Sequence, residues 1–234
     1  NIGIHSFSII GTYGTGKSSY LMALERDLIS NTHSLLQNKS VFGDCDKFEF
    51  LNILGDYRSL SYLLSDKLNC DRSDDTKNIF NALSDYYQFL KKKNKFLFIV
   101  IDEFGKILEH AAKNNPEKEL YFLQRLAEFV NSSRKIILIT TLHQNFGTYA
   151  QHLTDTQRNE WMKVKGRYKE IIFSEPVEQL LYLASEQLPI IKRPENYINS
   201  SEIFALATKA KFVSEHLELR TIKNLYPLDA FSAM

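Results

Sequence analysis

Residues 11–18 have the types and the spacing that binding of a phosphate group requires. They read Gly-Thr-Tyr-Gly-Thr-Gly-Lys-Ser and match the pattern G-x-x-x-x-G-K-[ST]. In such a loop glycines let backbone N–H groups converge on phosphate oxygens, Lys17 adds charge beside the β and γ phosphates, and Ser18 offers an oxygen to magnesium. The expected nucleotide-binding residues are Gly11, Thr12, Tyr13, Gly14, Thr15, Gly16, Lys17, Ser18 and Ser19.

Two carboxylates, Asp102 and Glu103, form the second candidate group. They follow the apolar run FLFIVI, which is typical of a strand buried on both faces. Ligands of open α/β folds bind at the carboxyl ends of such strands. We therefore expect Asp102 to hold magnesium through water and Glu103 to polarise the water that attacks the γ phosphate.

Other chemistries are less well supported. The residues from Asp102 to Gly105 also match D-x-x-G, a GTPase pattern, but no N-K-x-D segment that would recognise guanine is present. The motifs H-E-x-x-H and G-x-S-x-G are absent, and so is Cys/His spacing for zinc. Hydrolysis of a nucleoside triphosphate is the favoured chemistry, with adenine inferred from the missing guanine motif.

The elements that position these groups alternate between strands and helices. A strand is expected before the glycine loop and a helix over Lys17–Ser30 after it, where apolar residues recur at helical spacing. This alternation predicts an α/β fold with a parallel, doubly wound sheet. The expected strands are His5–Ile10, Phe48–Leu54, Lys95–Ile101, Lys135–Thr141 and Glu170–Phe173.

Three further helices are expected. One begins at Asp74 as N-cap and ends at the lysines of residues 91–93, and another begins after Asn115 with Pro116 in its first turn. Ser174 is expected to cap a helix from Glu175 to about Leu188. We therefore divide the chain into a sheet-based core over residues 1–174 and a helical part over residues 175–234.

Composition limits the class of protein. The 234 residues include 29 basic and 28 acidic side chains, so the net charge of +1 provides no global attraction for nucleic acid or membrane. An apolar fraction of 44% indicates a folded protein, and no run approaches the ~18 apolar residues that cross a bilayer. For that reason no membrane partner is expected. Cys45 and Cys70 lack the number and spacing of a disulfide framework, which favours a cytoplasmic setting.

With its phosphate loop, its acidic pair after a buried strand, a polar tip on the next strand and a helical C-terminal part, the chain resembles the AAA+ ATPase superfamily. The resemblance covers nearly the whole chain. It implies a three-layer P-loop NTPase core with a five-stranded parallel sheet of order 5-1-4-3-2, followed by a small helical lid. It also implies ATP and Mg²⁺ as cofactors and assembly into a homo-oligomer.

The same resemblance implies three further roles, for which five residues are candidates. His143 falls at the position of the sensor-1 residue after the fourth strand, and Thr141 is the alternative. Arg167, in a Gly-Arg-aromatic segment before the fifth strand, is the candidate arginine finger that a neighbouring subunit supplies. Arg158 is the alternative finger, and Arg220 is the candidate sensor 2.

A second resemblance is more specific. The segments IDEFGKILEHAA, LITTLHQNF, QRNEWMKVKGRY and YPLDAF are similar to large multidomain ATPases of prokaryotic antiphage defence. This implies a bacterial protein that acts with a protein effector or with nucleic acid. Because residue 1 is Asn1 rather than Met and a strand follows at once, we expect the chain to be part of a longer protein. Two alternatives to an ATPase stay open: a nucleotide-gated switch with slow hydrolysis, and a nucleic-acid-dependent motor.

Overall fold

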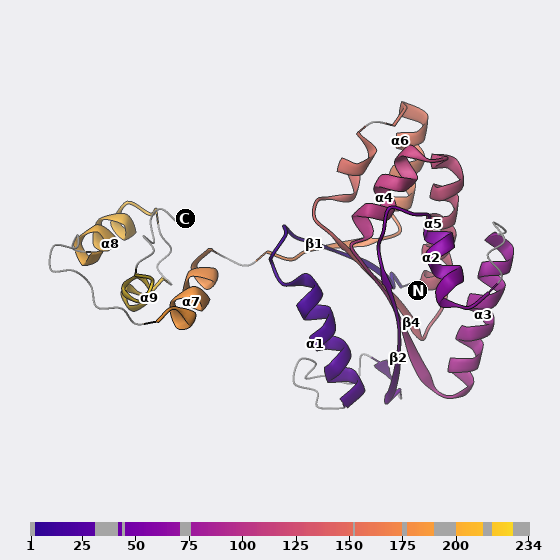
Figure 1. Cartoon of the computed structure of the whole chain (residues 1–234), viewed down its shortest axis with the longest axis horizontal. Helices are drawn as coiled ribbons and strands as arrows, with labels where there is room; N and C mark the ends of the chain where they lie inside the picture. The colour runs from indigo at the N-terminus through magenta and orange to yellow at the C-terminus, as the bar shows by residue number, and fades with distance from the viewer. Residues whose placement is uncertain are drawn as a thin grey trace. The chain divides into compact units, whose positions relative to one another are not determined.

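A computed structural model gives the fold of the chain (Figure 1). The residues that it describes are 3–30, 42–43, 45–70, 76–151, 153–174, 177–189, 200–212 and 217–226. They fall into two compact units, Asn1–Phe173 and Ser174–Met234. The expected N-cap Asp74 and the start of the expected helix at Glu175 lie outside the described residues.

A parallel five-stranded sheet forms the centre of the first unit, with the order β2-β3-β4-β1-β5. Counted from the other edge this is 5-1-4-3-2, so the expected α/β fold and sheet order are confirmed. Each strand agrees with its predicted range to within one residue at either end. The strands are β1 (Ser6–Ile10), β2 (Lys47–Leu54), β3 (Lys95–Asp102), β4 (Ile136–Leu142) and β5 (Lys169–Ile172).

Helices cover the two faces of the sheet unequally in the described part of the chain. The connection from β1 to β2 runs toward one edge, whereas the later connections run the opposite way, and right-handed crossovers then place their helices on opposite faces. Among the described helices of this unit, α1 (Lys17–Ser30) therefore lies by itself on one face (Figure 1). The other face carries α2 (Leu60–Lys67), α3 (Thr76–Lys92), α4 (Phe104–Lys113), α5 (Pro116–Asn131) and α6 (Asp155–Lys165).

Strand β3 is apolar on both faces because it belongs to two cores. Successive side chains of a strand point to opposite faces, so its residues are shared alternately between the layers. Leu97, Ile99 and Ile101 pack into the core on the side of α2 to α6. Phe96, Phe98 and Val100 pack into the smaller core beneath α1.

Two side chains on the helices of this unit make hydrogen bonds that help to hold the fold. Helix α2 is short, and Ser59 caps it by accepting from the backbone N–H of Ser61. Trp161 of α6 is fully buried, and its Nε1 donates to the carbonyl of Phe146 at 2.9 Å. Trp161 is therefore a core residue of this unit.

The second unit consists of helices in its described part. They are α7 (Val177–Gln187), α8 (Ser200–Lys209) and α9 (Leu219–Asn224). A small core of Leu181, Leu217, Ile222 and Leu225 holds them together. None of the helices in the described ranges of the chain is long and apolar enough to cross a membrane.

Candidate nucleotide-binding site

The glycine loop joins the end of β1 to the start of α1, as its pattern predicts. Gly14 and Gly16 have φ angles of 79° and 87°, the left-handed region that disfavours every other residue. Gly11 is required for a different reason, because a Cβ atom on it would lie 2.2 Å from the carbonyl oxygen of Phe173. The three glycines thus give the loop its path beside β5.

Lys17 is buried within this loop. Its Nζ donates to the carbonyl oxygens of Gly11 and Thr12 at 2.6 and 2.7 Å. Burial lowers the pKa of Lys17, and the nearby charge of Asp102 offsets part of this effect. A phosphate bound in the loop would compete with these two carbonyls for the ammonium group.

Thr141 connects the two carboxylate residues. Its Oγ1 donates to Oδ1 of Asp102 at 2.5 Å and accepts from the backbone N–H of Glu103 at 2.9 Å. Thr141 is only 1% exposed to solvent, so its hydroxyl group bonds to these two protein groups rather than to water. Thr141, the alternative sensor residue, therefore holds Asp102 and Glu103 in place.

Glu103 occupies an unusual position in the backbone. Its φ of 54° is left-handed, and it is the N-cap residue of α4 without a capping side-chain hydrogen bond. Its carboxylate instead forms an ion pair with Lys106, one turn into the helix. The carboxylate is thus held at the mouth of the site rather than against the helix terminus.

Gly55, which the sequence analysis misses, packs against the backbone of Asp102 and Glu103. Its N–H donates to the carbonyl of Asp102 at 2.7 Å, and a Cβ on it would lie 2.3 Å from the carbonyl oxygen of Glu103. The sequence feature that could have identified Gly55 is its place as a lone glycine directly after a strand. Gly105, the glycine of D-x-x-G, is explained by packing too, because a Cβ there would meet the hydroxyl of Tyr149 at 2.3 Å.

His143 follows β4 and lies at the same end of the sheet. Its imidazole stacks on the ring of Tyr13 with 3.7 Å between centroids. Burial and the charge of Lys17 lower the pKa of His143, although the carboxylates of Glu103 and Asp102 act the other way. The ring is therefore mainly neutral at neutral pH.

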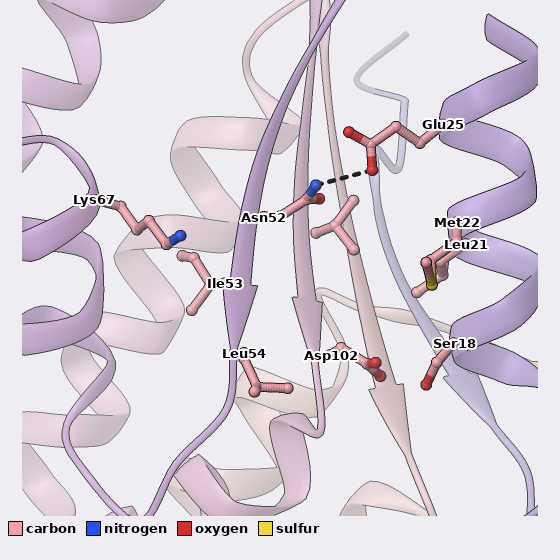
Figure 2. A pocket seen from close by; sticks show the side chains of 10 residues that line it. Ser18, Leu21, Met22, Glu25, Asn52, Ile53, Leu54, Lys67 and Asp102 are labelled. Atoms are coloured by element: carbon pink, nitrogen blue, oxygen red, sulfur yellow. Dashed lines mark hydrogen bonds between the residues drawn. The ribbon is translucent and has the colours of Figure 1, made fainter. Parts of the chain in front are cut away.

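Two adjoining hollows meet at Ser18 and Asp102. A hollow of about 260 Å³ is lined by the glycine loop together with Glu103, Thr141 and His143. A groove of about 320 Å³ lies between α1 and strands β2 and β3 (Figure 2). In Figure 2 the side chains of Ser18 and Asp102 point toward one another.

Ser18 and Asp102 suit a magnesium ion. A hydroxyl and a carboxylate are the hard oxygen donors that Mg²⁺ prefers, and the ion usually keeps several waters and substrate phosphates as further ligands. The described residues contain no group of three or more His, Cys, Asp or Glu that could hold a metal without such help. The donor set therefore fits a metal that arrives with a nucleotide.

The candidate arginines of the first unit, Arg167 and Arg158, are not among the residues that line this hollow. Arg167 precedes β5 and so lies at the edge of the sheet where strands begin, opposite the glycine loop. Its Nη2 and Nε donate to Oε1 of Glu128 at 2.8 and 3.1 Å. Arg158 points to the carbonyls of Gln151 and Leu153, and Arg220 belongs to the second unit.

The sheet order and the loop together define a P-loop fold of the AAA+ type. Two structures of the Aeropyrum pernix ORC2 protein, in ADPNP-ADP complexes and in the ADP form, match this chain with TM-scores of 0.50. Their sequence identities to it are 14% and 17%, over 79% and 80% of the chain. The matches cover 45% and 46% of those chains, so this chain spans less than half their length.

Comparison with models of known protein families gives no match, and comparison with proteins of curated function gives none either.

Proposed function

We propose that this chain is a magnesium-dependent ATPase module of the AAA+ type. The observation that carries the proposal is the convergence of the glycine loop with Asp102 and Glu103 at one end of the sheet. Adenine is favoured because the guanine-reading motif is absent, and the similar ORC2 structures contain ADP or ADPNP.

Each residue has a distinct role in the proposed reaction. Lys17 and the loop amides bind the phosphates, while Ser18 and Asp102 would hold Mg²⁺, which neutralises phosphate charge when bound. Glu103 accepts a proton from the attacking water. The oxygen of that water bonds to the γ phosphorus, and the bond between the γ phosphorus and the leaving ADP oxygen breaks. Thr141 holds Asp102 and Glu103 in position through its two hydrogen bonds.

Arg167 is proposed to act from a second copy of the chain. Within its own subunit it lies at the sheet edge opposite the loop, so it cannot reach its own nucleotide. A guanidinium supplied by a neighbour would stabilise charge on the transferring phosphoryl group. The proposal thus includes a homo-oligomer with shared sites. Arg220, a residue of the second unit, stays the proposed sensor-2 residue.

The wider setting is proposed from the sequence resemblance. We propose a role in bacterial antiphage defence, with a protein effector, in the cytoplasm, where the free thiols of Cys45 and Cys70 would persist. A plaque assay with the full-length gene and its Lys17→Ala variant tests this role. Equal protection by both versions would refute a role that needs ATP.

Phosphate release from MgATP, measured as a function of protein concentration, tests the enzymatic proposal. Turnover should rise faster than linearly with concentration and be lost in Glu103→Gln and Arg167→Ala, while Glu103→Gln still binds ATP. If oligomerisation follows ATP binding and turnover is negligible in the wild type, the chain is instead a nucleotide-gated switch.

Nucleic-acid-dependent turnover stays a second candidate, and lysines gather at the edge of the sheet where the strands begin, although Lys95 forms an ion pair with Glu49 at 2.7 Å. Lys47 and Lys95 are register partners on β2 and β3, and residues 91–93 end the preceding helix. Lys135 joins them by donating to Asn94 at 2.5 Å. Turnover that DNA or RNA stimulates at low salt and not at high salt would support this candidate.

A further inference from the structure

Tyr13, at the tip of the glycine loop, forms a ring stack with His143. The centroids are 3.7 Å apart and the ring planes differ by 23°. The two residues follow β1 and β4, which are neighbouring strands although they lie far apart in the chain. The stack therefore connects the phosphate-binding loop to the polar residue beyond the next strand.

Packing of the core does not explain the ring of Tyr13. The residue is 76% exposed, whereas a tyrosine that contributes to a core is largely buried. Among the described aromatic contacts, its partner is His143. The contact thus affects the site rather than the interior of the fold.

The stack also sets the orientation of His143. Nδ1 of the imidazole is buried and has no hydrogen-bond partner among the described residues. A histidine that no hydrogen bond holds at this nitrogen is oriented by packing, and here the packing surface is Tyr13. Nε2 is then the nitrogen that can meet a ligand in the hollow, which His143 lines together with Lys17 and Glu103.

We infer that Tyr13 is a positioning residue, whose ring sets the plane of the His143 imidazole beside the terminal phosphate of bound ATP. The inference rests on the proposed ATPase function. Gly14 and Gly16 leave the loop with little steric restraint, so the stack ties its tip to the end of β4. Removing the ring should therefore affect the chemical step more than nucleotide binding, because Lys17 and Ser18 remain.

Steady-state turnover of MgATP gives the first readout. Tyr13→Ala should lower kcat about 10-fold, the largest effect expected from the loss of one aromatic pair, with a smaller change in KM. Tyr13→Phe should retain most of the wild-type turnover, because the phenylalanine ring can still stack on His143. In the His143→Ala background Tyr13→Ala should cause no further loss, since its effect passes through the imidazole.

A second readout does not depend on activity. In ¹H–¹³C spectra of histidine-labelled protein, the ring protons of His143 should be shifted upfield by the Tyr13 ring, and His143→Asn assigns the signal. Tyr13→Ala should move this signal downfield, and Tyr13→Phe should leave it shifted. A signal that Tyr13→Ala does not move would overturn the stack and with it the inference.

The two proposals fail in different ways. If the wild type neither binds nor hydrolyses MgATP, the proposed function is wrong and the inference falls with it. If the wild type hydrolyses ATP but Tyr13→Ala matches it, or the losses of the two alanine variants multiply in the double variant, the inference is wrong and the ATPase stands. A Tyr13→Phe variant as slow as Tyr13→Ala would also overturn the stacking role.

Discussion

The hydroxyl of Thr141 donates a 2.5 Å hydrogen bond to Oδ1 of Asp102, and its oxygen accepts from the backbone N–H of Glu103. One side chain on β4 thereby fixes both carboxylate residues that follow β3. The parallel register makes this contact available, because Ile101 lies beside Thr140 and the residues that follow them, Asp102 and Thr141, are therefore neighbours at the ends of the two strands. Thr141 is thus the link between the two strand ends.

Thr141→Val should lower turnover by about 10- to 100-fold, because a hydrogen bond to a charged group contributes roughly 1.5–3 kcal/mol. Valine keeps the shape of the side chain but neither donates to Asp102 nor accepts from Glu103. Thr141→Ser is the matched control and should retain most activity. Phosphate-release kinetics at saturating MgATP measure the effect, and a Val variant as active as the Ser variant would contradict it.

Gly55→Ala should lower both stability and turnover. The new Cβ would lie 2.3 Å from the carbonyl oxygen of Glu103, so the backbone before α4 must move, and overpacking of this kind costs about 1–3 kcal/mol. Gly166→Ala is the control for stability, because its Cβ would meet nothing closer than 3.6 Å. Denaturant unfolding of both variants, with turnover of Gly55→Ala, checks the prediction, which equal unfolding midpoints would refute.

Glu128→Gln should release Arg167 for action in a neighbouring subunit. Hydrogen bonding from Gln124, together with Arg167, lowers the pKa of Glu128, so the carboxylate is charged at neutral pH and attracts the guanidinium. The pair is partly exposed, so its loss should cost less than about 1 kcal/mol of stability. Turnover at limiting protein concentration should rise, and Arg167→Ala should abolish the gain. A fall in turnover would show that the pair supports activity.

Stability should decrease at alkaline pH through Tyr149. Burial raises the pKa of Tyr149 to about 12 from 10.0, so its neutral form is favoured in the folded state. The contribution is complete below pH 10 and is lost as pH rises from 10 toward 12, because the unfolded chain ionises first. Tyr149→Phe cannot ionise, so the unfolding midpoint of the wild type should fall relative to this variant above pH 10. Parallel pH curves would contradict this assignment.

Local patterns in the sequence were sufficient to predict the loop and the strands. Residues 11–18 carry a pattern whose geometry is local, since glycines, a lysine and a serine act within one turn between a strand and a helix. Strands β3 and β4 were predictable because both faces are buried, which leaves long apolar runs. The sheet order followed from the AAA+ resemblance carried by these motifs.

The pairs of residues that meet across the site could not be predicted from local patterns. Thr141 and Asp102, Tyr13 and His143, and Gly55 and Glu103 lie on different strands or the loops after them, and no local pattern relates the members of a pair. Their contacts depend on parallel register and strand order, which bring distant strand ends to one edge of the sheet. Sequence spacing reports periodicity within one element, whereas these pairs arise from the packing of separate elements against each other.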